Sequence, residues 1–409
     1  MNTTTAPGFH MPASAPAAAR SALLLLQRLQ HGTLSLQLPD GSVQQFGQHE
    51  PHAPVLSARI VLHNWNVCSA AFKSGDIGFA ESYINGDWTS PDLVDLLKLF
   101  VRNRQQIESV VYGTWVGRLV YWLRHLMNRN TRNNSQKNIH AHYDLGNPFY
   151  ALWLDESWNY SSAWFNGNPD QPMVDAQRAK VHRALRMANV QPGHRVLEIG
   201  CGWGALAQAA CTEFGAHLTG VTLSSEQLAF ANQRMAKLQA QPLCDLRLQD
   251  YRDIQDAPFD AICSIEMVEA VGREYWPQYF QTVARLLKPG GRACIQSIVI
   301  DDALYERYIR STDFIQQYIF PGGCLPSPSA FRAQAKAAGL HVVDELAFGM
   351  DYAETLKRWR NDFVAKRQQV LQLGFDEKFL RIWEFYLAYC EAAFAGGNTD
   401  VMQFTLQKS

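Results

Sequence analysis

The sequence predicts an α/β fold built on a doubly wound, parallel β-sheet, and three observations support this prediction. From residue 175 onward, short apolar segments typical of strands alternate with helical segments. The first apolar segment, "HRVLEIG", leads directly into a run that contains Gly200, Gly202 and Gly204. A Lys-Pro-Gly-Gly turn precedes the fifth such segment. Glycines between a strand and a helix let the backbone turn tightly and approach a ligand.

Each element of this domain follows from its own pattern. Five apolar segments predict strands, and helical periodicity predicts the helices between them. Two more strands are predicted near the C-terminus, with two long helices between them that would form a cap over one sheet edge. The predicted strands are 194–200, 216–224, 244–250, 259–267, 291–300, 341–349 and 401–407, and the predicted helices are 204–214, 225–238, 275–287, 352–373 and 376–394.

The N-terminal part of the chain has a different pattern. With 409 residues, the chain is long enough for two or three domains. Residues 1–20 are rich in Ala, Pro, Thr and Ser and predict a disordered tail, with a transit peptide as the alternative. Residues 21–112 predict a small α+β domain. It contains a hairpin around Pro39-Asp40-Gly41 and a helix with Ser90 as its N-cap.

Residues 113–137 predict a basic amphipathic helix. The surrounding stretch 109–143 has no acidic residue, and its cations include Arg118, Arg124 and Lys137. Trp and Leu residues recur there at helical spacing. A basic amphipathic helix with tryptophans is typical of a helix that lies on a membrane surface. A linker helix whose apolar side packs on the protein itself is an equal alternative.

The composition excludes several classes of function. The formal net charge is -1, so no overall field attracts the chain to nucleic acid. The eight cysteines include no Cys-x-x-Cys pair, which argues against a disulfide framework or a zinc site and fits a reducing cytosol. No apolar run reaches the length of a membrane span. We therefore expect no metal, no nucleic-acid partner and a cytoplasmic location.

The spacing of the glycine loop limits the class of ligand that it can bind. The pattern is Glu-x-Gly-x-Gly-x-Gly from Glu198, not the Gly-x-Gly-x-x-Gly of dinucleotide sites, and no basic residue stands near it to meet a pyrophosphate. Such a loop suits a zwitterionic amino acid group. With "FDAIC" and "RLLKPGGRACI", it resembles the class I S-adenosylmethionine-dependent methyltransferases. Thr222 and Gln227 stand where that class usually has an acid for the ribose.

Six further segments narrow the resemblance: "HYDLGNPFYALWLD", "YSSAWF", "GVTLSSEQ", "LQDYRD", "YIFPGGCLPS" and "DYAETLKRW". Together they resemble the cyclopropane-fatty-acyl-phospholipid synthases and the related mycolic acid methyltransferases, from about residue 30 to the C-terminus. The resemblance implies transfer of a methylene group from S-adenosylmethionine to the cis double bond of an acyl chain in a membrane phospholipid. It also implies peripheral contact with the inner membrane surface, an N-terminal lipid- or partner-binding domain, and a catalytic domain over 138–409 with a helical acyl-binding cap. Homodimers are common among the bacterial synthases.

The resemblance also assigns roles to individual residues. The donor is held by the glycine loop and by segments on either side of it. In the family that the sequence resembles, a bound bicarbonate removes a proton, and it is held by a glutamate, a histidine, a tyrosine and main-chain groups. Carried over to this sequence, the donor-binding residues are Tyr143, Tyr160, Ser161, Glu198, Gly200, Cys201, Gly202, Trp203, Gly204, Thr222, Leu223, Ser224, Gln227, Asp250 and Tyr251, and the catalytic residues are Glu269, Tyr318, Gln296, Ser162, Ile298 and Cys390.

The proton-removal site departs from the family's pattern. Gln296 replaces the histidine, Ser162 replaces a cysteine, and Ala270 replaces a second histidine. A glutamine can donate a hydrogen bond to an anion but cannot carry a charge or relay a proton. We expect bicarbonate to bind through Glu269 and Tyr318 and a cyclopropane ring to form from a carbocation. A methyl- or methylene-branched chain, a small soluble acceptor, and a lipid-binding protein without activity are the alternatives.

Overall fold

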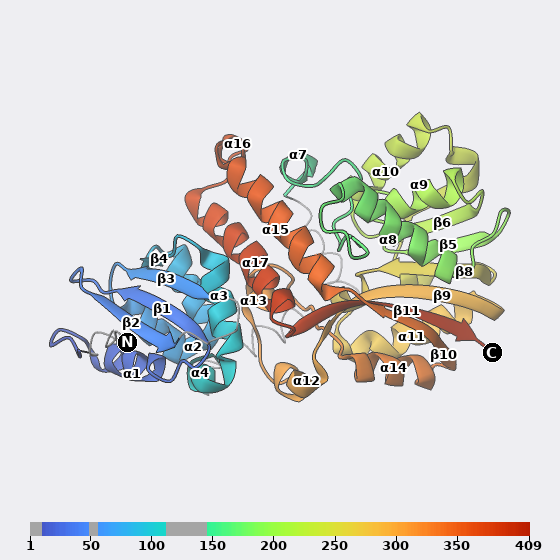
Figure 1. Cartoon of the computed structure of the whole chain (residues 1–409). Helices are drawn as coiled ribbons and strands as arrows, with labels where there is room; N and C mark the ends of the chain where they lie inside the picture. Colours follow the sequence, from blue (N-terminus) through green and yellow to red (C-terminus); the bar gives the residue numbers. More distant parts are fainter. Residues whose placement is uncertain (1–9, 49–55, 112–144) are drawn as a thin grey trace. The chain divides into compact units, whose positions relative to one another are not determined.

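The computed structural model of the chain describes residues 10–48, 56–111 and 145–409 (Figure 1). The predicted basic helix over 113–137 lies outside these residues. The chain divides into two compact units. Unit 1 comprises Met1–Met127, Arg310–Ile319 and Val370–Asn398, and unit 2 comprises Asn128–Ile309, Phe320–Gln369 and Thr399–Ser409.

Unit 1 contains a four-stranded sheet in the order β2-β1-β3-β4. The predicted hairpin is confirmed, because β1 and β2 pair in antiparallel fashion. In its turn Gly41 has a φ of 84°, which glycine adopts without steric cost, and the main-chain N–H of Ser42 donates to Oδ1 of Asp40 at 2.9 Å. β3 runs parallel to β1 and antiparallel to β4. The strands are β1 (Gly32–Gln37), β2 (Val43–Gln48), β3 (Ser57–Leu62) and β4 (Trp88–Thr89).

The helices of unit 1 include two segments from the C-terminal half of the chain. α17 packs against α2 and α3, and Phe385 of α17 meets Phe314 of α13 edge-on, with ring centroids 4.9 Å apart. The second of the two predicted C-terminal helices therefore belongs to unit 1. The helices are α1 (Ala17–Leu26), α2 (Asn66–Ile84), α3 (Leu93–Arg102), α4 (Arg104–Val111), α13 (Phe314–Tyr318) and α17 (Glu377–Ala395), and α16 (Arg367–Gln372) contains residues of both units.

Two helix starts in unit 1 differ from the predictions. α1 begins at Ala17, inside the twenty residues predicted to be a disordered tail. α3 is capped by Asp92, whose side chain accepts a hydrogen bond from the main-chain N–H of Asp95 at 2.9 Å, and not by Ser90. Both residues are good N-caps, but the hydroxyl of Ser90 instead donates a hydrogen bond to the main-chain oxygen of Arg59 at 2.7 Å.

Unit 2 is built on a seven-stranded sheet in the order β10-β11-β9-β8-β5-β6-β7. The five predicted central strands are confirmed and run parallel to their neighbours. β11, however, is antiparallel to both β9 and β10, so the sheet is mixed rather than parallel throughout. The strands are β5 (Arg195–Ile199), β6 (His217–Thr222), β7 (Cys244–Leu248), β8 (Phe259–Ile265), β9 (Leu287–Ile300), β10 (Leu340–Ala347) and β11 (Thr399–Lys408).

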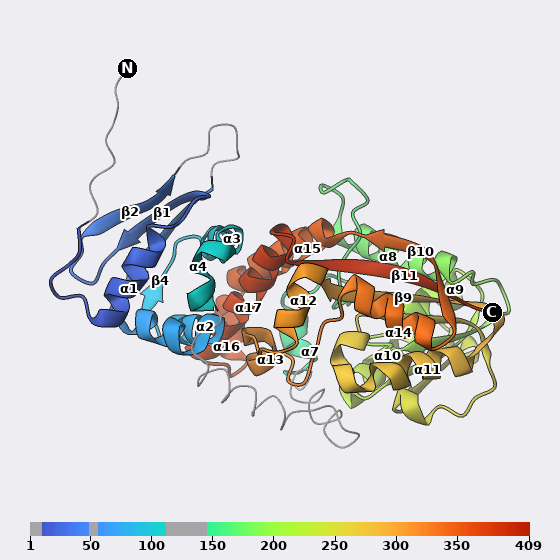
Figure 2. The same ribbon diagram turned by 90° about the horizontal axis from the view of Figure 1, so that it is seen from below.

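Helices cover both faces of this sheet (Figure 1). Successive side chains of a strand point to opposite faces, so Val196 packs in a core with α8 and α9, while Leu197 packs in a core with α11 and α14. Figure 2 shows α11 and α14 side by side. The rings of Phe280 on α11 and Phe331 on α14 are in contact, with their centroids 4.9 Å apart. The helices are α7 (Asn147–Tyr150), α8 (Met173–Met187), α9 (Ala205–Thr212), α10 (Ser225–Lys237), α11 (Trp276–Leu286), α12 (Asp302–Tyr308), α14 (Pro328–Ala337) and α15 (Gly349–Ala365).

Crossing a bilayer requires a helix that is both long and apolar. None of the helices in the described ranges meets both conditions.

Candidate active site

The loop between β5 and α9 requires glycine at three positions. Gly200, Gly202 and Gly204 have φ angles of 87°, 51° and 82°, in the left-handed region that side chains disfavour. A Cβ on Gly200 would lie 3.0 Å from Cγ of Met267, and one on Gly204 would lie 3.0 Å from Cβ of Ala231. The loop therefore depends on glycine for its conformation and for close packing on both sides.

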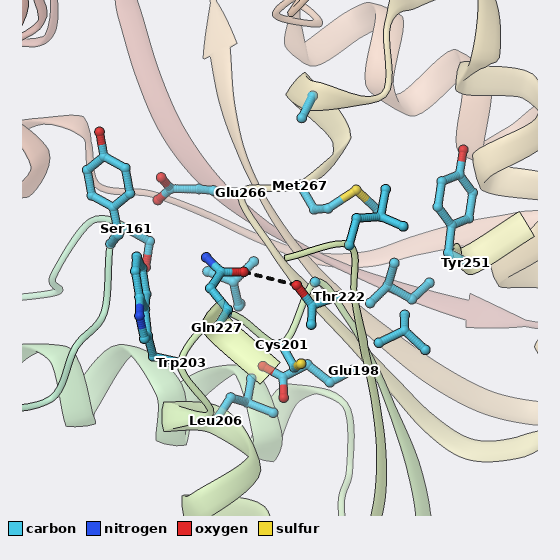
Figure 3. A pocket seen from close by; sticks show the side chains of 18 of the residues that line it. Ser161, Glu198, Cys201, Trp203, Leu206, Thr222, Gln227, Tyr251, Glu266 and Met267 are labelled. Carbon is cyan, nitrogen blue, oxygen red and sulfur yellow. Dashed lines mark hydrogen bonds between the residues drawn. The ribbon is translucent and has the colours of Figure 1, made fainter. Parts of the chain in front are cut away.

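A pocket opens beside this loop, at the carboxyl ends of β5, β6 and β8 (Figure 3). Doubly wound sheets bind ligands at this edge. Ser161 and Trp203 lie on one side of the pocket, and Tyr251 lies on the other. The predicted donor-binding residues that line the pocket are Tyr160, Ser161, Glu198, Gly200, Cys201, Gly202, Trp203, Thr222, Leu223, Gln227, Asp250 and Tyr251.

Three predicted donor-binding residues are not among those that line the pocket. Gly204 begins α9, and Ser224 caps α10 by accepting a hydrogen bond from the main-chain N–H of Gln227 at 3.2 Å. Both therefore shape the pocket from behind. Tyr143 lies outside the described residues.

Thr222 and Gln227 form a neutral pair at the end of β6, where an acid was expected from the fold class. The hydroxyl of Thr222 donates to Oε1 of Gln227 at 3.0 Å, and both side chains are buried (Figure 3). Since Oε1 accepts this bond, the Nε2 group of Gln227 is the donor that remains for a ligand hydroxyl. The pair can thus bind a ribose without a charge.

Glu198 lies on β5 beneath the loop and is 3% exposed. Burial raises its pKa, while the charge of Lys180 lowers it. Its Oε2 atom is buried and has no hydrogen-bond partner within the described part of the chain. An orphaned carboxylate oxygen beside a ligand loop fits a ligand that brings a positive charge or a hydroxyl. The lining thus fits S-adenosylmethionine, which supplies an electrophilic methyl group when bound.

Asp250 and Tyr251 follow β7 on the far side of the pocket. The main-chain N–H and the Nε group of Arg252 both donate to Oδ1 of Asp250, at 2.9 and 2.8 Å, and fix the carboxylate. The ring of Tyr251 meets that of Tyr279 edge-on at 5.6 Å, and burial raises the pKa of its hydroxyl. The hydroxyl therefore stays neutral at physiological pH.

The segment Asp155–Phe165, which contains the predicted "YSSAWF" contacts, is fixed from two sides. The side chain of Ser161 contacts Nζ of Lys180 on α8, and Lys180 is fully buried. The main-chain N–H of Phe165 donates to Oδ2 of Asp351 on α15 at 2.7 Å. Burial lowers the pKa of Lys180 to about 8, although nearby acids oppose this change.

Glu266 is a pocket residue that the sequence analysis did not select. It follows β8 directly, and its Oε1 atom accepts hydrogen bonds from the main-chain N–H of Ser162 at 2.9 Å and from Nε2 of Gln296 at 2.7 Å. Its Oε2 atom accepts a third from the hydroxyl of Tyr352 at 2.7 Å. Burial raises the pKa of Glu266, while Lys180 and these donors lower it. The available signal was its position, an acid at the carboxyl end of a central parallel strand.

Glu269 lies one turn further on, in a short 3₁₀-helix (Val268–Ala270). Its Oε1 atom accepts the main-chain N–H of Ile298, and its Oε2 atom is buried without a hydrogen-bond partner among the described residues. Burial, and then the negative charge of Glu266, raise the pKa of Glu269 to about 8. Four of the predicted catalytic residues are thus brought together, because Ser162 and Gln296 contact Glu266 while Ile298 contacts Glu269.

The other two predicted catalytic residues belong to unit 1. The hydroxyl of Tyr318 donates to Oε1 of Glu81 at 2.6 Å, and its ring stacks on Phe314 with centroids 5.4 Å apart. Cys390 lies on α17, where burial raises the pKa of its thiol. A catalytic role for either residue stays a prediction.

The sequence matches known families and proteins over most of its length. A family model described as mycolic acid cyclopropane synthetase matches residues 130–404. A tuberculostearic acid methyltransferase of Mycobacterium tuberculosis is 38% identical over 410 residues, which cover 97% of this chain and 92% of the relative. The cyclopropane-fatty-acyl-phospholipid synthase of Escherichia coli is 32% identical over 355 residues, which cover 86% of this chain and 88% of the relative.

Solved structures agree with these matches. A mycolic acid cyclopropane synthase complexed with SAH and CTAB has a TM-score of 0.63 and 32% identity, and the match covers 67% of this chain and 98% of that chain. A second cyclopropane synthase, from Mycobacterium tuberculosis, also has a TM-score of 0.63, with 28% identity and the same coverage. Taken with the fold and the donor pocket, these matches show that the chain belongs to the mycolic acid cyclopropane synthetase family, which includes the cyclopropane-fatty-acyl-phospholipid synthases, and that it is an S-adenosylmethionine-dependent methyltransferase of lipid acyl chains.

Proposed function

We propose that the chain transfers a one-carbon unit from S-adenosylmethionine to the cis double bond of an unsaturated acyl chain in a membrane phospholipid. The observation that carries this proposal is the carboxyl group of Glu266, which lines the donor pocket, together with that of Glu269 three residues further along the chain. An alkene carbon has no acidic proton to lose before it attacks a methyl donor, but its product must lose one afterwards. These carboxyl groups supply a place for that proton.

The extent of the matches supports a phospholipid as the substrate. The relatives named mycolic acid synthases cover 66% of this chain. The relative named a phospholipid synthase covers 86% and therefore matches much of unit 1 as well. We propose that the enzyme works from the cytoplasmic surface of the inner membrane through peripheral contact, with unit 1 as a lipid- or partner-binding part and with homodimers as its assembly. A methyltransferase for a small soluble acceptor would not need unit 1.

The product is a cyclopropane ring or a branched chain, and an observation favours each. The relatives named cyclopropane synthases support the ring. Gln296, which donates to Glu266 in place of the expected histidine, supports the branch, as does the relative named a tuberculostearic acid methyltransferase, which covers 97% of this chain. We propose the ring as the product and a methylene branch as the second candidate.

Bicarbonate is the proton acceptor that the resemblance implies. In this chain, however, the main-chain N–H groups of Ser162 and Ile298 already donate to Glu266 and Glu269. We therefore propose the one-carbon transfer without assigning its proton to bicarbonate, and infer the acceptor separately.

The test is expression of the full chain in a bacterium that makes unsaturated phospholipids, followed by mass spectrometry of the phospholipid acyl chains. We expect a new population of chains heavier by one CH2. Proton NMR then separates ring hydrogens from those of a methylene branch. If no acyl chain gains a CH2, the proposed function is wrong.

A further inference from the structure

We propose that the carboxylate of Glu266 is the base that takes the proton from the transferred carbon, in place of a bound bicarbonate. The proposal rests on the proposed function, since it assigns a role within that reaction. It makes Glu266 a catalytic residue of this chain.

Glu266 is placed to reach the reacting atoms. It lines the donor pocket, on the same side as Ser161 (Figure 3). A carboxylate has about four directions in which it accepts hydrogen bonds. Two donors reach its Oε1 atom, and the hydroxyl of Tyr352 reaches Oε2. One acceptor direction of Oε2 therefore remains for a proton that leaves the substrate.

A chain of hydrogen-bonded polar groups fixes the carboxylate as an acceptor. The guanidinium of Arg183, held by Asp344 at 2.6 Å, donates to Oε1 of Gln403 at 2.7 Å. A guanidinium only donates hydrogen bonds, so the oxygen of Gln403 must face Arg183 and its NH2 group must face Gln296. Nε2 of Gln403 therefore donates to Oε1 of Gln296 at 3.0 Å. Nε2 of Gln296 consequently points at Glu266 and donates to it at 2.7 Å. The polar chain holds Glu266 ready to accept, not to donate.

The backbone at Glu266 is strained in a way that glycine would relieve. Its φ is 50°, in the left-handed region that residues other than glycine rarely adopt. Its main-chain N–H is held there by the main-chain oxygen of Gln296 at 2.8 Å. Strain of this kind is concentrated at functional sites, where a particular side chain is required despite its energetic cost. A structural role alone would be served better by glycine.

The main-chain donors expected to hold bicarbonate are already occupied by the protein. The N–H of Ser162 donates to Glu266, and the N–H of Ile298 donates to Glu269. Gln296 also spends its amide donor on Glu266. The carboxyl groups of Glu266 and Glu269 thus receive the contacts that a free anion would need.

Burial raises the pKa of both glutamates, but the groups around them act differently on the two carboxyls. Glu266 accepts three hydrogen bonds and is stabilised as an anion by Lys180, whereas Glu269 accepts one bond from the main chain of Ile298. Burial and the charge of Glu266 raise the pKa of Glu269 to about 8. Neighbouring carboxyl groups whose surroundings act differently on their pKa values are typical of an acid–base pair. Glu266 is the member whose hydrogen-bond donors and neighbouring cation favour the ionised form.

The chemistry balances with Glu266 as the base that takes the proton from carbon. The π electrons of the double bond form a C–C bond to the methyl carbon, while the C–S bond of the donor breaks and its electron pair stays on sulfur. The other alkene carbon is left with a positive charge. Glu266 then takes a proton from the transferred carbon, and the electrons of that C–H bond close a three-membered ring. If a hydride first moves between the two former alkene carbons, the same electrons form a double bond between the chain and the transferred carbon, which gives a methylene branch. On the way to either product, the proton is lost from the same carbon, the one that was transferred.

The test compares the full-length wild-type enzyme with Glu266→Gln, and with Glu345→Gln as the matched control. Glu345 lies on β10 in a surface ion pair with Arg332. Turnover is measured on vesicles of a cis-monounsaturated phosphatidylglycerol, in carbonate-free buffer and with added bicarbonate. We expect the wild type and the control to be equally active in both buffers. Glu266→Gln should lose kcat by about 100-fold or more, the usual range for a general base. Its affinity for S-adenosylhomocysteine should be unchanged.

A second variant, Glu266→Gly, keeps the test informative if Glu266→Gln folds poorly. Glycine suits the φ of 50° and leaves space for an anion. We expect this variant to be inactive without carbonate and to regain part of its turnover with bicarbonate or formate. A donor with a trideuterated methyl group adds a readout of the chemical step. Its isotope effect should be larger in Glu266→Gln than in the wild type, because proton removal has become slower.

Two results overturn the assignment of Glu266 while leaving the proposed function intact. One is a wild type that converts the lipid but loses its activity when carbonate is removed. The other is a Glu266→Gln enzyme with wild-type kcat. A wild type that converts no unsaturated phospholipid overturns the proposed function itself, and the assignment of Glu266 with it.

Discussion

The main-chain N–H of Ser162 donates to Oε1 of Glu266 at 2.9 Å, although the two residues are 104 positions apart in the sequence. Ser162 belongs to the aromatic segment Asp155–Phe165, and Glu266 ends a central strand of the sheet. The bond therefore ties that segment to the carboxyl edge where the donor pocket lies. Any change that moves the segment also moves a hydrogen bond of the carboxylate.

Replacement of Glu269 by glutamine should remove activity without removing donor binding. Glutamine keeps the size of the side chain and its bond to Ile298, but it cannot take up or release a proton. We expect kcat to fall by about 100-fold. Calorimetry with S-adenosylhomocysteine should give the wild-type affinity, and Glu345→Gln serves as the control. An equal loss of donor affinity would contradict a role for Glu269 in the chemical step.

The raised pKa of Glu269 should make the protein less stable as the pH rises. Below its ordinary pKa of 4.5, Glu269 is protonated in the folded and the unfolded chain. Between 4.5 and about 8 the unfolded chain loses this proton first, so stability falls with pH across this window, and the loss is complete above about 8. The side chain of Glu269→Gln does not titrate, so this variant does not lose stability in this way. The difference in Tm between this variant and the wild type should therefore grow in favour of the variant from pH 5 to about 8. A difference in Tm that stays the same at all pH values would show that Glu269 is not buried in its neutral form.

Replacement of Gly204 by alanine should weaken donor binding. The new Cβ would lie 3.0 Å from Cβ of Ala231, and the φ of 82° would be strained by about 1 kcal/mol or more. α9 and α10 would have to move apart, which would distort the pocket. We expect the affinity for S-adenosylhomocysteine to fall by about tenfold, as measured by calorimetry.

Gly193→Ala is the matched control for Gly204→Ala. Gly193 has a similar φ of 77°, but a Cβ there would meet no atom within 4 Å. It should lower the Tm through the same backbone strain and leave donor affinity unchanged. A similar loss of donor affinity in both variants would mean that strain alone, rather than the contact with Ala231, is responsible.

Replacement of Lys180 by methionine should destabilise unit 2 more at high pH than at low pH. Lys180 is fully buried, and its charge acts on Glu266 and Glu198. Without it, either carboxyl group would be buried without a neighbouring cation whenever it is ionised, and removal of one partner of a buried pair costs about 3–5 kcal/mol. Protonation of the carboxyl groups removes this cost, so the difference in stability between the wild type and Lys180→Met should become smaller at low pH. Thermal melts at several pH values measure it, with Lys336→Met, at an exposed position of α14, as the control. A gap in Tm that does not change with pH would mean that packing, not charge, explains the loss.

Local patterns were sufficient to predict most elements of unit 2 and the donor loop. The strand β5, the glycines after it and the start of α9 depend on residues that are neighbours in the sequence. The same holds for the hairpin around Gly41. The choice between Ser90 and Asp92 as the cap of α3 could not be made locally, because both are good caps and a contact to Arg59 decides between them.

The sequence by itself determined the fold class, the family and the position of the donor loop, since these depend on spacing along the chain. Only the tertiary structure decided the direction of β11, because the same apolar pattern suits a parallel and an antiparallel strand. It also decided the importance of Glu266. That residue gains its meaning from Ser162, Gln296 and Tyr352, which come from three other segments and meet only when the chain is folded. A carboxylate becomes a candidate base through its partners, and those partners are remote in the sequence.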